Sequence, residues 1–503
     1  MESLYIFEIT LNSICKIGRI NFQTDDIGKN CHFFLSCVLV CILLIVGISP
    51  VFAQSGSGWS EPLLLSGTES GNMSPSLTTG PSEHVYAAWI YNSLEETETI
   101  GSIYVAAGQG GEWGNPVDVI APYGNHGLSN LKACASNDGY LYLMWQEQSV
   151  WISSAPINDV LNLHAWSEPV EVISPLGIGV GIADLAIDNS GVLHVAYPDG
   201  QIVNYTFSLD GGLTWSSPVI IGGIQDPEQV IHGSQIAVDN VGRIFVAWNA
   251  LQLPDGWPPQ GVYVASSGDG GQTWQVKQLE GSNHNYVSIA ISENNEVHLV
   301  WNTAGGLGGR YHSVSRDGGV FWSMPDRFTE LSGSTQLFVM LMFDPWGTLH
   351  LATIADGTID GTRHSQSPFY MSWNGTWSSP ELIVSLPKGD ANRIAMTVSE
   401  GNIIHVLWQQ GDGGIWYSKK VTNAPTLPIH SVPDATPVLK ETEVAVLMPT
   451  HPIPFDAGDS SLQWQETEAA SSRGDLTPIF LAAVSVVAFI GISAVIVKSR
   501  KRF

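Results

Sequence analysis

The chain has 503 residues, of which 13% are charged, and it contains 52 glycines and 18 tryptophans with a formal net charge of −27. This length allows a large buried core, and the turn-rich, aromatic-rich composition favours many short strands over a coiled coil or an acidic disordered chain. The negative charge excludes nucleic acid as a partner, because phosphate binding requires a basic surface.

Residues 1–53 are predicted to be a leader followed by a signal peptide. An apolar run within residues 32–56 has the length of a signal-peptide core, and Val51-Phe52-Ala53 provides the small-residue pattern of a cleavage site. An uncleaved membrane anchor is the alternative. Four of the five cysteines lie in this leader, so the exported part retains Cys134 alone and is expected to have no internal disulfide and no cysteine metal site.

The segment 57–421 contains two kinds of repeated strand. The first is an alternating apolar strand that usually ends in an aromatic residue, and successive ends lie 51–56 residues apart. Its seven copies end at Trp89, Trp145, Tyr197, Trp248, Trp301, Thr353 and Trp408. The second starts with Trp, mostly with Pro three residues later, and its seven copies begin at Trp59, Trp113, Trp166, Trp215, Trp274, Trp322 and Trp377. The alternation and the Asp, Asn and Gly residues between strands are typical of β-hairpins.

The order of the two kinds of strand predicts a closed ring. The strand at Trp59 precedes every aromatic-ended strand, and the strand ending at Trp408 has no Trp-Pro strand after it. In a ring, the N-terminal strand completes the last sheet, whereas a linear array leaves both ends incomplete. We therefore predict an all-β fold, a seven-bladed β-propeller over 57–421 that is closed by its N-terminal strand. A six- or eight-bladed ring is the alternative, if one degenerate blade is miscounted.

An octet recurs at the hairpin before the outer strand of three blades. It is SLDGGLTW at 208–215, SGDGGQTW at 267–274 and SRDGGVFW at 315–322. Asp and Ser side chains accept hydrogen bonds from the backbone of a turn, Gly tolerates positive φ, and Trp packs between blades. Every position in the octet therefore has a structural reason, and none requires a substrate.

These octets resemble the Asp-box, or BNR repeat, of sialidases and related propellers. The first two copies match almost fully, and the third has Phe321 where Thr is usual. In that family the boxes lie at the blade periphery, so the resemblance implies a structural role for the octet residues. They are Ser208, Asp210, Gly212, Thr214 and Trp215, then Ser267, Asp269, Gly271, Thr273 and Trp274, and last Ser315, Asp317, Gly319 and Trp322.

The resemblance also raises the question of a sialidase site. Such a site uses three arginines on the substrate carboxylate, since each guanidinium pairs a carboxylate bidentately, together with a Tyr–Glu pair and an Asp. The usual early Arg-Ile-Pro is missing, and the nearest counterpart is Arg393-Ile394-Ala395 in the last blade. An anion site is nevertheless predicted from Arg310, Arg363 and Arg393, which lie in three successive blades, with Tyr311, Glu147 and Asp360 as companions. The alternative is that these arginines pair with surface carboxylates.

The C-terminal part is predicted to anchor the propeller. Residues 422–475 are rich in Pro, Glu and Ser, which is typical of an extended stalk. Residues 476–497 are predicted to form a transmembrane helix, because they include twenty successive residues without a charge. The basic tail 498–503 then predicts a cytoplasmic C-terminus and an extracellular propeller.

Two functions are left open. The first is a binding or display module for a protein or a polysaccharide, with the loops 249–260 and 355–368 on the rim as contact candidates. The second is an exo-acting glycoside hydrolase of sialidase type, working through a carboxylate pair. The missing early Arg-Ile-Pro and the seven blades, where family sialidases have six, favour the binding module. No cofactor and no metal site are predicted.

Overall fold

The fold is known from a computed structural model. It describes residues 58–428 apart from 68–70, 96–97, 121–126, 174–180, 254–258, 281–283, 304–307, 333–338 and 387–389. These residues belong to one compact unit. The predicted leader, most of the predicted stalk, the predicted membrane helix and the tail lie outside the described residues. Within that described part, no helix is long and apolar enough to span a bilayer.

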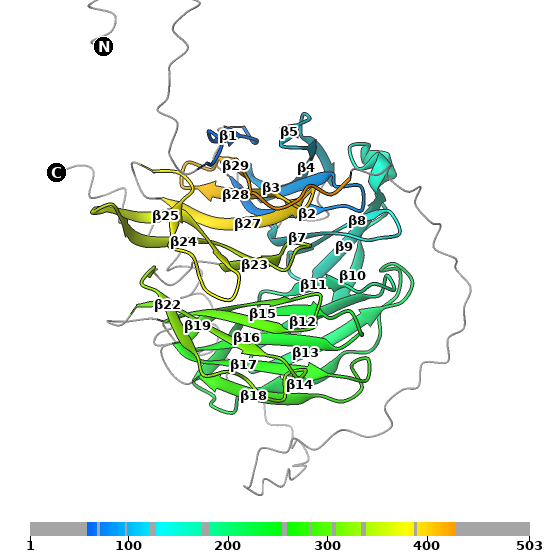
Figure 1. Cartoon of the computed structure of the whole chain (residues 1–503). Helices are drawn as coiled ribbons and strands as arrows, with labels where there is room; N and C mark the ends of the chain where they lie inside the picture. Colours follow the sequence, from blue (N-terminus) through cyan, green and yellow to red (C-terminus); the bar gives the residue numbers. More distant parts are fainter. Residues whose placement is uncertain are drawn as a thin grey trace, which may run out of the picture. The chain divides into compact units, whose positions relative to one another are not determined.

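In the described residues, the strands form seven antiparallel sheets, which we number as blades in chain order (Figure 1). Blade 1 contains β2 (Asn72–Thr79), β3 (Val85–Glu95), β4 (Glu98–Gln109), β5 (Glu112–Trp113) and β6 (Val117–Ile120). Blade 2 contains β7 (Ser129–Ala135), β8 (Tyr140–Gln146), β9 (Val150–Pro156) and β10 (Val170–Ile173). Blade 3 contains β11 (Asp184–Ile187), β12 (Leu193–Asp199), β13 (Ile202–Ser208) and β14 (Val219–Gly223).

The remaining sheets follow the same order. Blade 4 contains β15 (Gln229–Val238), β16 (Ile244–Gln252), β17 (Pro259–Ser267) and β18 (Gln275–Glu280). Blade 5 contains β19 (His284–Ile291), β20 (Val297–Thr303), β21 (Gly309–Ser315) and β22 (Asp326–Thr329). Blade 6 contains β23 (Val339–Phe343), β24 (Leu349–Ile359), β25 (Thr362–Trp373) and β26 (Glu381–Leu382). Blade 7 contains β27 (Ala391–Ser399), β28 (Ile403–Gln410), β29 (Ile415–Val421) and the N-terminal β1 (Leu63–Leu64).

The predicted ring closure is confirmed. Strand β1 pairs with β29, and Trp59 forms an isolated bridge to Lys420, so the start of the fold completes the last blade (Figure 1). The innermost strand of each blade contacts that of the next, and β2 of blade 1 also contacts β27 of blade 7. At this closing interface the Thr79 hydroxyl donates to the carbonyl of Val398 at 2.8 Å. The fold is therefore a seven-bladed all-β propeller.

The hydrophobic core lies between the blades. Each of the buried apolar clusters combines residues of two neighbouring blades, including one that joins blades 7 and 1. Four tryptophans of the second strands are at most 1% exposed, namely Trp89, Trp248, Trp301 and Trp408. A buried aromatic side chain removes about 150–250 Å² from water, so these residues contribute strongly to blade packing.

The ring has two ends, which we call the top face and the bottom face. The top face is the end at which the innermost strands begin and at which the second and third strands are joined. The bottom face is the end at which the innermost strands turn into the second strands and at which the octets lie. At the bottom face, Thr422 donates from its backbone to Asn402, and Leu427 donates to Glu400. The described beginning of the predicted stalk therefore leaves along the bottom face.

Candidate functional site

The innermost strands of five blades carry a β-bulge near the top face. At each bulge the innermost strand has one residue more than its neighbour, in β2, β7, β15, β19 and β27. Ser74, Asn130 and Tyr286 lie at these bulges with φ of 52°, 50° and 49°, a region that residues other than glycine seldom adopt. A bulge redirects a side chain, and strained backbone of this kind gathers at functional sites.

Four bulge residues form what we call the axial cluster: Asn130, His232, Tyr286 and Arg393. The Arg393 guanidinium donates from Nη1 to Asn130 Oδ1 at 3.2 Å, although blade 1 lies between their blades. A contact between blades that are not neighbours must run through the centre of the ring. The rings of His232 and Tyr286 lie edge to face, with centroids 6.0 Å apart. All four residues remain partly exposed, so solvent reaches the cluster.

The charge of Arg393 acts on both ring side chains of the cluster. Burial lowers the pKa of His232, and the positive charge of Arg393 lowers it further, so the imidazole is neutral at pH 7. Burial raises the pKa of Tyr286 to about 12, with Arg393 opposing, so the phenol stays protonated. Burial also lowers the pKa of Arg393 itself. Because the ordinary pKa of a guanidinium lies far above 7, Arg393 keeps its charge at neutral pH. The cluster thus combines one cation with a neutral imidazole, a phenol and an amide.

The other two arginines of the predicted anion site lie elsewhere. Arg310 is 0% exposed, and its Nη2 donates to the carbonyl of Ile354 in the next blade at 3.2 Å. Within the described residues its Nε and Nη1 have no hydrogen-bond partner, and burial lowers its pKa to about 9. Arg363 is exposed in the hairpin of β24 and β25 and lies 3.6 Å from Asp356. The three arginines therefore contact three different parts of the fold and do not converge.

The predicted companions do not gather around one point either. Tyr311 stacks on Trp301, with ring centroids 6.3 Å apart, between blades 4 and 5, whereas Arg310 faces blade 6. Asp360 has a φ of 50° in the turn between β24 and β25. Glu147 lies in the turn after β8 and donates from its backbone to the Ser149 carbonyl. Of the predicted site, only Arg393 belongs to the axial cluster.

One predicted rim loop is part of a long hairpin. Most of 355–368 pairs as the extended ends of β24 and β25, with a register shift between Ala355 and Gly357. Asp356 fastens this hairpin, since its Oδ1 accepts from the Ser365 hydroxyl at 2.9 Å and from the Gln366 backbone at 2.8 Å. Residues 254–258 of the other predicted rim loop lie outside the described residues. The hairpin therefore extends the top face as a paired, hydrogen-bonded edge.

The octets form closed turns at the bottom face. In the first, Ser208 Oγ accepts from the Gly212 backbone at 2.8 Å, and Asp210 accepts from the backbone and hydroxyl of Thr214 at 2.8 and 2.6 Å. The Trp215 indole donates to the Gly212 carbonyl at 3.2 Å. Burial tends to raise the pKa of Asp210, but the bonds from Thr214 and Ser208 outweigh it and lower that pKa. The acceptors of this octet are thus satisfied within the turn.

The other two octets repeat this arrangement. Asp269 accepts from the backbone and hydroxyl of Thr273, and Trp274 donates to the Gly271 carbonyl. In the third, Asp317 accepts from the Phe321 backbone at 2.9 Å, which holds its pKa below the usual range. Phe321 has no hydroxyl to donate, so this turn lacks one bond that the first two have.

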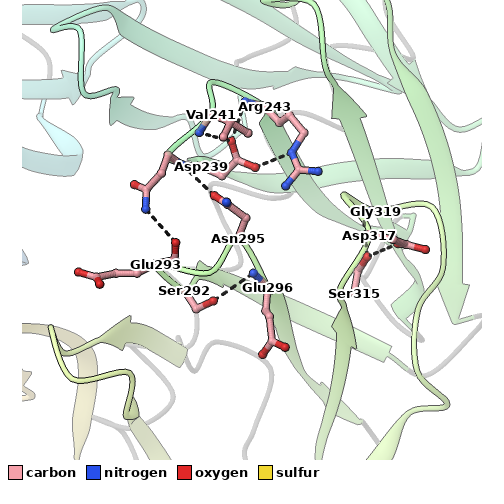
Figure 2. Close-up of polar contacts among 11 residues, drawn as sticks. Asp239, Val241, Arg243, Ser292, Glu293, Asn295, Glu296, Ser315, Asp317 and Gly319 are labelled. Carbon is pink, nitrogen blue, oxygen red and sulfur yellow. Dashed lines mark hydrogen bonds and ion pairs between the residues drawn. The ribbon is translucent and has the colours of Figure 1, made fainter.

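Neighbouring blades are also linked at the bottom face (Figure 2). Asp239 accepts from the Val241 and Arg243 backbones at 3.1 and 2.8 Å, and it pairs with the Arg243 side chain at 2.6 Å. Asn240 in the same turn donates to Asn295 Oδ1 at 3.2 Å and thus bridges blades 4 and 5. These contacts hold the turns to one another, which is a structural role.

Buried histidines form a second repeated feature. In three blades a histidine of the second strand bonds through Nδ1 to a tyrosine hydroxyl of the third strand, and blade 5 has a His–His pair instead. The pairs are His194–Tyr205, His350–Tyr370, His405–Tyr417 and His298–His312, at 2.7, 2.6, 2.8 and 3.0 Å. Burial, with the charge of Lys419, lowers the pKa of His405 to about 3. His405 is therefore a neutral part of the core.

Sequence reasoning missed Asn130, His232 and Tyr286 as partners of Arg393. A signal was present: Asn130, Tyr286 and Arg393 each precede the aromatic end of the following strand by 15 residues, and His232 does so by 16. Repeated spacing of this kind places residues at equivalent positions of successive blades, and the innermost strands of a propeller surround one axis. Aligning the repeats on their aromatic ends would therefore have placed all four residues in one ring.

Similar solved structures share the fold at low sequence identity. An ulvan lyase of polysaccharide lyase family PL25 has a TM-score of 0.51 at 12% identity, over 73% of this chain and 97% of the lyase. The BP39L lectin from Burkholderia pseudomallei has a TM-score of 0.50 at 12% identity, over 72% and 99%. The Hadza microbial sialidase Hz136 has a TM-score of 0.43 at 17% identity, over 64% and 73%. These likenesses show the fold alone.

No family model matches the chain, and no curated protein matches it. The class that the fold defines is a seven-bladed β-propeller whose structural neighbours include sialidases, a polysaccharide lyase and a lectin.

Proposed function

We propose that the chain is an extracellular binding module for an acidic saccharide, which it binds at the axial cluster. A C-terminal membrane helix at 476–497 anchors it, and the signal peptide at 1–53 exports it. The stalk at 422–475 lifts the propeller off the membrane. Its partners are thus the membrane and a carboxylated or sulfated glycan.

The observation that carries the proposal is the meeting of Arg393, Asn130, His232 and Tyr286 across the ring. A guanidinium binds a carboxylate or sulfate through charge-assisted hydrogen bonds. The phenol, the amide and the imidazole bond sugar hydroxyls, and an aromatic ring packs on the apolar face of a sugar.

The direction of the stalk supports display. The described chain leaves along the bottom face near Asn402, while Arg393 lies near the top end of the same blade. Ser399, at the end of β27, lies six positions after Arg393, which is roughly 20 Å along the strand. An anchor attached at the bottom would turn the axial cluster away from the membrane, toward ligands outside the cell.

The second function is hydrolysis of a terminal acidic sugar. It would need a second arginine near Arg393 and an acid–base pair of carboxylates or of Tyr and Glu. Arg310 is buried against the Ile354 carbonyl, and Arg363 pairs with Asp356 on the exposed hairpin, so neither supplies that second arginine. Binding therefore has the stronger support, since it requires the axial cluster only.

Calorimetric titration of the full chain in detergent tests the proposal, with acidic polysaccharides and the same polymers after reduction of their carboxylates to alcohols. We expect binding of the acidic polymers, loss of at least about tenfold in affinity with Arg393→Gln, and no change with Arg316→Gln. Arg316 is an exposed arginine that pairs with Glu296 at the bottom face, so it is a matched control. Equal binding of the neutral polymers, or full affinity in Arg393→Gln, would exclude this function.

Anchoring has a separate test. Removal of residues 476–503 should move the protein from the membrane fraction to the medium without changing affinity. If the shortened chain stays in the membrane fraction, the proposed anchor is wrong.

A further inference from the structure

The axial cluster contains the set of groups that an elimination uses. Cleavage of a 4-linked uronate by β-elimination requires a cation at the carboxylate, a base at C5 and an acid at the oxygen on C4. Arg393 is a guanidinium whose charge acts on the imidazole of His232 and the phenol of Tyr286, and these two rings contact each other. No step of this reaction needs a water nucleophile or an electron carrier.

We infer that the axial cluster cleaves a 4-linked uronate polymer by β-elimination, with Arg393 on the carboxylate, His232 as base and Tyr286 as acid. This inference rests on the proposed function, because the polymer must first bind at Arg393. It goes further by assigning an activity to the site and by restricting the ligand to saccharides that carry a uronate with a leaving group at C4.

The arrangement of the two rings fits the bonds that change. In a 4-linked glucuronate the C5–H and C4–O bonds lie on the same face of the sugar ring, so a base and an acid that lie side by side can act on both. The His232 and Tyr286 rings meet edge to face at an interplanar angle of 87°, with centroids 6.0 Å apart. Both side chains are partly exposed, and Arg393, whose charge acts on both, contacts Asn130. A single uronate on Arg393 would thus present both bonds to the two rings.

The protonation states of the two rings match their roles. His232 is neutral at pH 7, because burial and the charge of Arg393 both lower its pKa, so its free nitrogen is available as a base. Tyr286 remains protonated, since burial raises its pKa to about 12, and it carries the proton that a leaving oxygen needs. Arg393 stabilises the negative charge that develops on the carboxylate when the C5 proton leaves.

The step balances without a co-reactant. The C5–H bond breaks and its proton passes to His232, its electron pair forms the C4–C5 double bond, and the C4–O bond breaks. The departing oxygen takes the proton of Tyr286 and becomes the new hydroxyl of the released fragment. Transfer of the proton from His232 to the Tyr286 phenolate restores both residues. The products are one chain with an unsaturated uronate end and one chain with an ordinary hydroxyl end.

The experiment uses the full chain in detergent with a 4-linked galacturonate polymer and with a polymer containing 4-linked glucuronate. Ultraviolet absorbance of the conjugated C4–C5 double bond measures elimination, and calorimetry measures binding of the same polymers. We expect product with the glucuronate polymer, in which C5–H and C4–O lie on one face of the sugar, and little with the galacturonate polymer, in which they lie on opposite faces. His232→Gln and Tyr286→Phe should lower kcat by roughly 10²- to 10⁴-fold with KM changed little, whereas Arg316→Gln should match the parent. The parent's kcat/KM should rise with pH through the pKa of His232.

Each outcome decides between the two proposals. A polymer that binds through Arg393 but is never cleaved overturns the elimination and leaves the binding module standing. Cleavage that yields new ends without the double bond means hydrolysis and also overturns it. Polymers that neither bind nor react overturn both. Thermal unfolding of each variant shows that it has folded, and Tyr286→Phe keeps the ring, so a loss of product in that variant reports the hydroxyl.

Discussion

Replacing Trp59 by alanine tests how much the ring closure stabilises the fold. Trp59 is 6% exposed, lies edge-on to Tyr370 with ring centroids 5.3 Å apart, and has the Lys420 ammonium 5.9 Å from its ring centre. It is the first residue of the segment that completes blade 7, and it packs in the cluster between blades 6 and 7. Its removal should therefore loosen the closing blade.

The size of the loss follows from the buried area. A tryptophan at this burial removes about 200 Å² from water, which at about 25 cal/mol per Å² corresponds to about 5 kcal/mol. Residual burial in the unfolded chain reduces this figure by up to about 40%, to about 3 kcal/mol. Measured costs of truncating a buried Trp to Ala are about 3–5 kcal/mol. We therefore expect the free energy of unfolding to fall by about 3 kcal/mol.

Urea unfolding followed by circular dichroism measures this loss in a chain of residues 57–428. The matched control is Trp346→Ala, because Trp346 is 47% exposed and contributes one indole hydrogen bond, to Pro425. That variant should lose about 1 kcal/mol. A loss below about 1 kcal/mol in Trp59→Ala, or equal losses in the two variants, would mean that the packing of Trp59 does not hold the ring closed.

Three further predictions concern buried groups and turns. Burial lowers the pKa of His405 and His312 to about 3 each, so both stay neutral in the fold while the unfolded chain takes up protons below its value of 6.5. The free energy of unfolding is therefore unaffected by these two histidines above pH 6.5 and falls by roughly 1.4 kcal/mol per pH unit and histidine as the pH drops from 6.5 toward 3. Urea midpoints measured against pH test this. The fall of the midpoint with pH should be smaller in the variant with Gln at both positions. Asp269→Ala should cost about 1–2 kcal/mol in urea unfolding and leave glycan affinity unchanged, because the octet lies at the bottom face; reduced affinity would contradict that placement. Arg310→Met should leave both stability, to within about 1 kcal/mol, and glycan affinity unchanged, because it exchanges a buried guanidinium with one bond for an apolar side chain; a large loss of affinity would restore Arg310 to the binding site.

The ring could be predicted because its signals are local. Alternation within each strand, the aromatic ends and the unpaired position of Trp59 in the repeat order are all visible in the sequence, and β1 pairs with β29 as that order requires. Secondary structure of this kind depends on neighbours along the chain. The closure of the ring could be predicted from the number and order of the repeated strands, which their regular spacing makes visible.

The site was less predictable, because its residues meet through the ring and not along the chain. Arg393 was foreseen, but its contact with Asn130 depends on bulges in two separate blades. Arg310 was misplaced for a related reason. Its guanidinium is buried against the Ile354 carbonyl of blade 6, and this contact depends on how two blades pack, which no pattern along the chain marks.

The pairing of β1 with β29 also governs the order in which the protein is made. The hydroxyls of Ser60 and Ser418, which meet at 3.2 Å in the closed blade, are separated by 358 positions. A ribosome that adds about 5–20 residues per second needs roughly 20–70 s to pass from one to the other. During that time the N-terminal segment of the nascent chain has no partner strand, because β29 has not yet been synthesised. Premature termination within blade 7, before β29 ends at Val421, would thus leave an open ring with unpaired strand edges, which are ready templates for aggregation.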